Sequence, residues 1–299
     1  MPSRRHQLLA RVVPRIRRAQ DLVDEPTERA RLERRHAALD PSLPTRLVPR
    51  FAGRFSVVTE ELDGFPVHVI TPRGIDPART VVHVHGGGFI APVDDFHVRY
   101  ATRLALALGA RVVMPDYPLA PEHSWRDTVP PLVELTSRWL EQGRVTLLGD
   151  SAGGGPALAI ALALRDRGGP QPSELLLLSP WVDLTTSTPD TPAYAERDPW
   201  LFLGKVHAYA GWWAGSPDDL ARPEVSPALG DLTGLPRALM FCGTRDLLVP
   251  GCRLLAKRAA DVGWDLTYVE EPDLIHVFPI LPLLPEARTA WRTTLEFLA

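Results

Sequence analysis

Residues 144–158 read RVTLLGDSAGGGPAL, and the interpretation of the whole chain starts from this stretch. A short apolar run (RVTLLG) enters G-D-S-A-G at 149–153, and a run of helix-forming residues (GPALAIALALR) leaves it. G-x-S-x-G between a strand and a helix is typical of a nucleophile elbow, a sharp turn that strains the backbone of its serine. The serine hydroxyl then lies over a helix N-terminus, where amides favour negative charge. We predict Ser151 as a nucleophile; the alternative is a chance serine in a glycine loop.

A second glycine-rich motif, HGGG at 85–88, directly follows the apolar run TVVHV. Consecutive glycines after a strand leave backbone N–H groups unshielded, and such donors stabilise the tetrahedral oxyanion of acyl transfer. We predict an oxyanion hole formed by the N–H groups of Gly86, Gly87 and Ala152. The alternatives are a plain turn or a phosphate loop. A phosphate loop would need G-K-[ST], which is absent, and G-x-G-x-x-G does not fit here.

A serine hydroxyl needs a base to take its proton, and elbow enzymes place the residues in the order serine, acid, histidine. His276 follows the last expected strand after a short loop, so we predict it as the base, with His207 as a rival. Asp246 follows the apolar run RALMFCG and is predicted as the acid, with Asp183 as its rival. The remaining residues near these motifs are assigned structural or backbone roles: His68, His83, His85 and Asp150.

Between residues 55 and 271 short β-branched runs alternate with helical patterns, which predicts the α/β fold class with a mostly parallel sheet. Eight strands are expected, and the first two form an antiparallel hairpin. They lie at 55–60, 66–71, 80–85, 111–116, 144–149, 174–179, 237–243 and 266–271. The intervening helices are expected at 96–108, 127–142, 152–167, 251–262 and 285–298.

Two segments lie outside this alternation. The connection from 183 to 234 is too long for a plain crossover and contains its own helix with clustered aromatic residues. Residues 1–50 are rich in Arg and Glu, with breaks expected at Pro14, Pro26, Pro41 and Pro44. We expect residues 1–50 to form helices that contribute to a cap, and residues 51–299 to form one catalytic domain with a cap insertion at about 185–225.

The first helical segment is basic, with six arginines up to Arg18 and no acidic residue. It has apolar positions at helical spacing: Leu8, Leu9, Val12, Val13 and Ile16. A membrane-surface helix and a helix packed on the main domain both fit, and we favour the second. The arginine pair at 4–5 suggests an export signal, but more arginine follows instead of an apolar run, so export is rejected.

The overall composition is that of an ordinary globular protein, with a formal net charge of -3. This balance gives no electrostatic reason to expect binding to nucleic acid or to an acidic membrane surface. No stretch approaches the roughly 18 apolar residues of a spanning helix, so membrane insertion is not expected. Only two cysteines occur, Cys242 and Cys252, which rules out a disulfide framework and favours a reducing, cytoplasmic location. The expected partner is a small-molecule ester, and a homodimer is the one assembly that we consider.

With these residues placed, the chain resembles the hormone-sensitive-lipase-like (family IV) esterases of the α/β-hydrolase superfamily. The resemblance rests on HGGG together with DYPLAPEH (116–123), GDSAGG (149–154), SPWVDLT (179–185) and GTRDLL (243–248). It implies an eight-stranded α/β-hydrolase core with helices on both faces and a helical cap. It also implies a carboxylesterase for short to medium acyl chains, with no metal and no organic cofactor.

The chain departs from this family at two positions. The family often has Asp-Pro-Leu at the acid, whereas this chain has Asp246-Leu247-Leu248. The family often has arginine at the position of Pro118. The first departure leaves the acid in place but alters its loop.

Other functions remain open on the same machinery. An oxyanion hole suits any acyl carbonyl, so an amidase, lactonase or deacetylase is an alternative. A catalytically inactive ligand-binding relative is a second alternative, because plant gibberellin receptors resemble this group and have lost the base. The presence of His276 favours an enzyme. Trp200, Trp212 and Trp213, with Phe89 beside the glycines, either line an apolar substrate pocket or anchor the cap.

Overall fold

The protein was analysed as a computed structural model that describes residues 1–16 and 20–299. Its centre is a single sheet of eight strands in the order β1-β2-β4-β3-β5-β6-β7-β8. The strands are β1 (Phe55–Leu62), β2 (Phe65–Pro72), β3 (Arg79–Val84), β4 (Arg111–Pro115), β5 (Arg144–Asp150), β6 (Glu174–Leu178), β7 (Ala238–Arg245) and β8 (Leu266–Ile275). All eight predicted strands are confirmed, and the predicted β1–β2 hairpin is antiparallel.

The sheet is parallel from β4 through β8, while β2 runs antiparallel to both of its neighbours. Its central strands carry Val and Leu on both faces, so successive residues enter different cores. Leu147 lies in one hydrophobic cluster, and Leu148 lies in the other. This two-sided burial explains why the strands are nearly continuous apolar runs.

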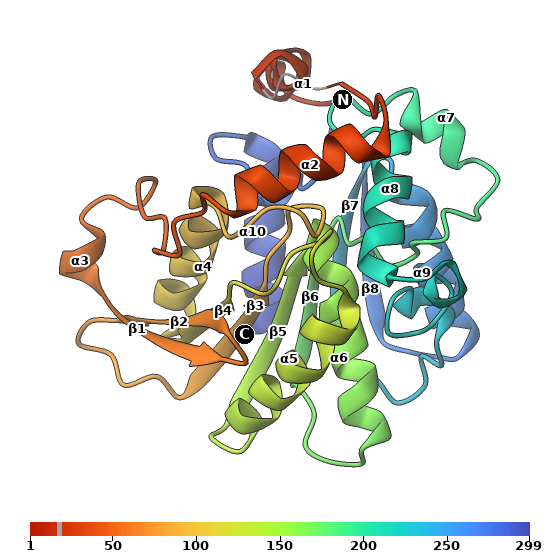
Figure 1. Ribbon diagram of the computed structural model, residues 1–299. Helices are drawn as coiled ribbons and strands as arrows, with labels where there is room; N and C mark the ends of the chain where they lie inside the picture. Colours follow the sequence, from red (N-terminus) through yellow and green to blue (C-terminus); the bar gives the residue numbers. More distant parts are fainter. Residues whose placement is uncertain (17–19) are drawn as a thin grey trace.

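Helices cover both faces of the sheet (Figure 1). Residues of α4 (Asp95–Leu108) and α10 (Pro285–Leu298) contribute to one cluster, and residues of α5 (Trp125–Leu140), α6 (Gly154–Asp166) and α9 (Val249–Asp261) contribute to the other. These five helices confirm the predicted ones, with shifts of up to two residues at their ends. The chain therefore has the fold of an α/β-hydrolase core.

The N-terminal segment forms α1 (Arg4–Ile16), α2 (Glu25–His36) and α3 (Phe51–Arg54). The prediction of a break at Pro14 was wrong, because α1 continues through it to Ile16. A proline in the last turn removes only one hydrogen bond, close to where the helix ends anyway. Arg17 and Arg18 of the predicted basic segment lie outside the described residues.

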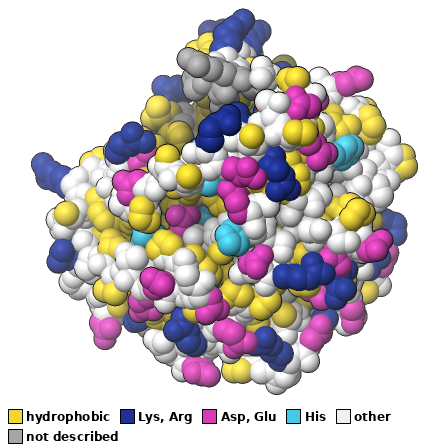
Figure 2. All heavy atoms as spheres, viewed as in Figure 1, with side chains coloured by type: hydrophobic (Ala, Val, Ile, Leu, Met, Phe, Trp, Pro, Cys, Tyr) yellow, Lys and Arg dark blue, Asp and Glu magenta, His cyan; other side chains and the backbone are white. Residues whose placement is uncertain are grey.

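The apolar side of α1 packs on the main body, as favoured from the sequence. Ala10 and Val13 are buried against a cluster formed by Ile275, Leu281, Leu284 and Ala287. Leu8, one of the expected apolar positions, is instead 64% exposed. Basic side chains gather around α1 at the top of the face in Figure 2, and acidic and basic groups are interspersed below. Within residues 1–16 and 20–299 no helix is both long enough and apolar enough to span a membrane.

The insertion between β6 and β7 (179–237) holds two helices, α7 (Thr191–Ala195) and α8 (Leu203–Ala214). In Figure 1, α2 crosses the upper end of the sheet and approaches α8. Helices α2 and α8 are joined directly, because the Tyr209 hydroxyl of α8 donates a hydrogen bond of 2.5 Å to Glu28 of α2. Segments far apart in the sequence thus meet above the carboxyl ends of the strands.

Candidate active site

Ser151 lies at the tight junction between β5 and α6, on the 3₁₀ turn η1 (Ser151–Gly153). Its φ of 51° is in the left-handed region, which is strained for a residue with a side chain. The turn is possible because Gly153 has no side chain. A Cβ atom on Gly153 would lie 2.1 Å from the carbonyl oxygen of Val84. The strained serine and the close approach to β3 are the features expected of a nucleophile elbow.

Ser151, His276 and Asp246 come together although they are far apart in the sequence. The Ser151 hydroxyl lies 2.7 Å from Nε2 of His276, and Nδ1 of His276 lies 2.8 Å from Oδ2 of Asp246. The three residues follow β5, β8 and β7, whose carboxyl ends are on one edge of the sheet. The other oxygen of Asp246 accepts the N–H of Leu248 at 3.0 Å, which fixes the carboxylate in its loop.

The electrostatic surroundings of His276 favour its protonated form. Burial is the largest single influence and disfavours the imidazolium, but the charge of Asp246 and its hydrogen bond to the ring oppose burial, and the net effect of all the neighbours is a raised pKa of His276. The carboxylates of Asp198 and Asp150 act in the same direction. The ring is therefore a stronger base than a free histidine, which suits it to accept a proton from Ser151.

The two rivals considered for these positions are occupied elsewhere. Asp183 is buried, and its Oδ1 accepts hydrogen bonds from the N–H and hydroxyl groups of Thr185. His207 is exposed on α8, and its Nε2 lies 2.8 Å from the Thr186 hydroxyl. Neither side chain forms part of the hydrogen-bonded line that joins Ser151 to Asp246.

The glycine motif lies beside the elbow. Gly87 lines the same cavity as Ser151, and its φ of 120° is a conformation that favours glycine. A Cβ atom on Gly87 would lie 2.6 Å from the carbonyl oxygen of Ala91. Within residues 1–16 and 20–299, the N–H groups of Gly86 and Gly87 have no protein acceptor. Ala152 is fully buried and directly follows Ser151.

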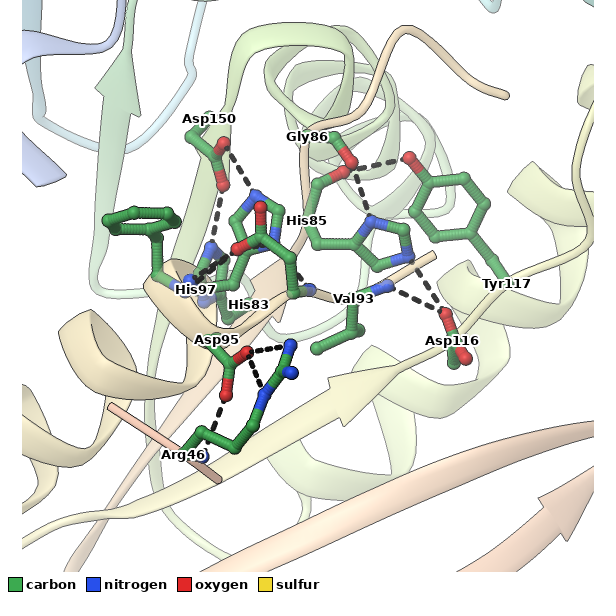
Figure 3. A network of polar contacts seen from close by, with 12 residues as sticks. Arg46, His83, His85, Gly86, Val93, Asp95, His97, Asp116, Tyr117 and Asp150 are labelled. Carbon is green, nitrogen blue, oxygen red and sulfur yellow. Dashed lines mark hydrogen bonds and ion pairs between the residues drawn. The ribbon is translucent and has the colours of Figure 1, made fainter. Parts of the chain in front are cut away.

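A buried group of titratable side chains contacts both the Ser151 turn and the glycine motif. The sequence did not predict this group. Figure 3 shows the carboxylate of Asp150 between two histidine rings. Its oxygens lie 2.8 Å from Nε2 of His83 and 3.2 Å from Nε2 of His97. Gly86 rests on the same carboxylate, because a Cβ atom there would lie 2.4 Å from Oδ2 of Asp150. Asp150, the residue directly before Ser151, therefore contacts the glycine motif.

The charges in this group are balanced. Burial opposes a charge on His97, but the carboxylates of Asp150 and Asp94 together outweigh burial and raise the pKa of His97 to about 10. Burial likewise opposes the charge on Asp150, but the charge on His97 and the hydrogen bond from His83 lower the pKa of Asp150 below its usual range. Burial lowers the pKa of His83, so its neutral ring donates to Asp150. The structure thus contains a close, buried Asp150–His97 pair, and Nδ1 of the same ring lies 3.0 Å from the backbone N of Asp94.

The His85 side chain contacts Gly86, the first glycine of the motif. Its Nδ1 donates to the carbonyl oxygen of Gly86 at 2.7 Å, and its Nε2 lies 3.4 Å from Asp116. The Tyr117 hydroxyl donates to the carbonyl oxygen of His85 at 2.7 Å (Figure 3). The expectation that His85 has a role within the motif is confirmed.

The three residues Ser151, His276 and Gly87 border a cavity of about 510 Å³. Aromatic and aliphatic side chains from the insertion, the β7–α9 loop and the β8–α10 connection form part of its wall, including Trp181, Trp200, Phe202, Leu248, Ile280 and Leu281. The clustered aromatic residues divide into two groups. Trp200 lines the cavity, whereas Trp213 is fully buried and stacks on Phe89 with ring centroids 4.1 Å apart.

The cavity wall combines these apolar side chains with polar and charged ones, including Arg35, Asp94 and Lys205. Ser151 and His276 thus lie in a hollow of mixed character that can admit a small organic molecule. Among the described residues, no group of three or more His, Cys, Asp or Glu side chains is arranged to hold a metal ion.

Comparisons with known proteins agree with this geometry. A model of the alpha/beta hydrolase fold family matches residues 81–280, which include Ser151, Asp246 and His276. The chain is 35% identical over 237 residues to an acetyl-hydrolase of Streptomyces hygroscopicus, covering 76% of this chain and 79% of that protein. It is 29% identical over 252 residues to carboxylesterase NlhH of Mycobacterium tuberculosis, covering 78% and 77% respectively. Its structure matches an esterase of the bacterial hormone-sensitive lipase family with a TM-score of 0.81 and 28% identity, covering 100% of this chain and 98% of that one.

Proposed function

The chain belongs to the alpha/beta hydrolase fold family and to its hormone-sensitive-lipase-like esterases, and from that premise we propose that Ser151, His276 and Asp246 are its catalytic triad. The observation that carries the proposal is the continuous line of hydrogen bonds from the Ser151 hydroxyl through the His276 ring to Asp246. This arrangement activates a serine that would otherwise be a poor nucleophile.

In the proposed reaction, the Ser151 oxygen attacks the ester carbonyl while Nε2 of His276 takes the hydroxyl proton. Asp246 holds the ring in the required tautomer and stabilises the imidazolium. The tetrahedral intermediate collapses when His276 returns the proton to the leaving alcohol, which leaves an acyl group on Ser151. Water activated by His276 then releases the carboxylic acid and regenerates the hydroxyl.

The negative oxygen of the intermediate would be stabilised by the N–H groups of Gly86, Gly87 and Ala152. The N–H groups of Gly86 and Gly87, which have no acceptor within the described residues, and the position of Gly87 in the cavity wall support this assignment. Removal of one such donor typically costs about 10²- to 10³-fold in turnover.

We propose short to medium acyl esters as substrates, with acyl chains of about eight carbons or fewer. The similarity to an acetyl-hydrolase and the resemblance to the hormone-sensitive-lipase-like esterases support small acyl groups. We also propose that residues 1–50 and the insertion at about 185–225 form a cap over this cavity. The two buried, unpaired cysteines support a cytoplasmic location.

A serine-directed phosphonate and a p-nitrophenyl ester series test the proposal. We expect a covalent adduct on Ser151, none on a folded Ser151→Ala variant, and the highest kcat/KM with short acyl chains. Absence of an adduct on folded wild-type protein would overturn the nucleophile assignment. A maximum at long acyl chains would overturn the substrate class alone.

A further inference from the structure

A buried carboxylate in the insertion, Asp198, contacts the loop that carries Asp246. Asp198 lies between α7 and α8 and is only 7% exposed. Its Oδ1 accepts the N–H groups of Trp200 at 2.7 Å and Leu201 at 3.1 Å, which closes a local turn. Its Oδ2 accepts the N–H of Leu247 at 2.7 Å, across 49 residues of sequence. One side chain thus orders the insertion and joins it to the residue that follows Asp246.

The insertion is attached on both sides of Asp246. On one side, Nε of Arg245 donates to the carbonyl oxygen of Arg197 at 3.0 Å. On the other side, the N–H of Leu247 donates to Asp198, as described above. A proline at position 247 could not make this bond, because proline has no N–H. Leu247, one of the departures noted in the sequence, is therefore the residue type that allows this connection.

The same carboxylate also accepts a hydrogen bond from a residue whose side chain packs on His276. The backbone N–H of Trp200 donates to Asp198. Its indole ring packs edge-on against the His276 ring, with ring centroids 5.8 Å apart and an interplanar angle of 78°. Trp200 also lines the cavity. Asp198 is therefore bonded to two segments that adjoin the His276 ring. One is the loop that carries Asp246, and the other is the turn that carries Trp200.

The charged groups around Asp198 come from several elements. Asp246 and His276 face it from the loops after β7 and β8. Arg197 is paired with Asp273 at 3.4 Å, with both side chains more than half exposed. Burial, with the charge of Asp246, raises the pKa of Asp198 to about 7. The charge on Asp198 in turn contributes to the raised pKa of His276.

We propose that Asp198 is a positioning residue for the triad: it fastens the insertion to the Asp246 loop, holds Trp200 against His276, and adds negative charge beside the imidazole. The proposal rests on His276 acting as the base of the proposed function. It assigns the insertion a part in catalysis besides covering the cavity.

The test is the pH profile of kcat/KM for full-length Asp198→Asn, measured with p-nitrophenyl butyrate from pH 5 to 9. Asp198 gains its negative charge over the same pH range in which His276 titrates, so its loss lowers the pKa of His276 only in part, and we expect the acidic limb to move to lower pH by about 0.5 unit. We expect kcat to fall several-fold with little change in KM. Asp190→Asn is the matched control, because Asp190 is exposed in the same insertion and makes no capping hydrogen bond. It should match wild type.

The proposal would be overturned if Asp198→Asn matched wild type both in kcat and in the midpoint of the acidic limb of its pH profile. A lower kcat with an unchanged midpoint would also overturn it. Leu247→Pro and Leu247→Ala separate the hydrogen bond from the charge, because only the alanine variant keeps the N–H. We expect several-fold lower kcat for the proline variant than for the alanine variant, and equal values would contradict the positioning role. Failure of the triad itself is distinguishable, since Ser151 would then not react with the phosphonate in wild type.

Discussion

Replacement of His97 by phenylalanine tests whether the buried Asp150–His97 pair near Ser151 is an ion pair. The substitution keeps an aromatic side chain on α4 but leaves the Asp150 carboxylate with only neutral His83 as a ring partner. A histidine whose pKa rises from 6.5 to about 10 contributes about 5 kcal/mol to stability while it is protonated. Breaking a buried ion pair typically costs about 3–5 kcal/mol, so both considerations lead to the same range.

The assay is urea unfolding of wild type and His97→Phe across pH, with exposed His123→Phe as the control. The stabilisation from His97 is fully present below pH 6.5 and is lost as the pH rises through about 10. We therefore expect the free energy of unfolding to differ by about 3–5 kcal/mol at pH 6.5 and the difference to shrink towards pH 10. A difference below about 1 kcal/mol at pH 6.5, or one that is independent of pH, would refute the ion pair.

Other measurements test the site and its surroundings. Asp246→Asn should lower kcat/KM by about 10⁴-fold with p-nitrophenyl butyrate while the protein stays folded, and a loss below ten-fold would contradict its role as the acid. Because the pKa of His276 is raised, wild-type kcat/KM should fall as the pH drops through a value above 6.5, and a midpoint below 6.5 would contradict the electrostatic account. Trp213→Ala should reduce the free energy of unfolding by about 3–5 kcal/mol, since the ring is fully buried on Phe89. A loss below about 1 kcal/mol in urea unfolding would show that this stack contributes little.

The predictions that succeeded depend on local patterns. The eight strands could be located because two-sided burial makes each a short apolar run, and Leu147 and Leu148 both carry that signal. Ser151 could be located because its elbow needs glycine where the backbone of another strand comes close. His276 and Asp246 followed from their positions just after strands, which parallel topology brings to one edge. Their hydrogen-bonded geometry is as expected, and their roles remain a proposal.

The residues that were missed make contacts that no local pattern encodes. His97 lies within an amphipathic helix and meets Asp150 across 53 residues, so its position in the sequence is that of an ordinary helical histidine. Asp198 lies in an irregular segment, and its partner at Leu247 is a backbone N–H, which leaves no trace in the residue type of that partner. Pro14 was misjudged because a proline near the end of a helix costs little. Such contacts depend on how the loops pack over the sheet edge.

The place where the insertion leaves the core has an evolutionary consequence. The chain departs at the end of β6 and returns at β7, and these two strands are hydrogen-bonded neighbours in the sheet. A change in length or sequence within about 185–225 therefore leaves the pairing and the register of β6 and β7 intact. On such a scaffold this segment is the part that can differ between relatives with different substrates, while Ser151 and the charges around it keep their places. In such a change, Asp198 would be the residue that a new segment has to replace.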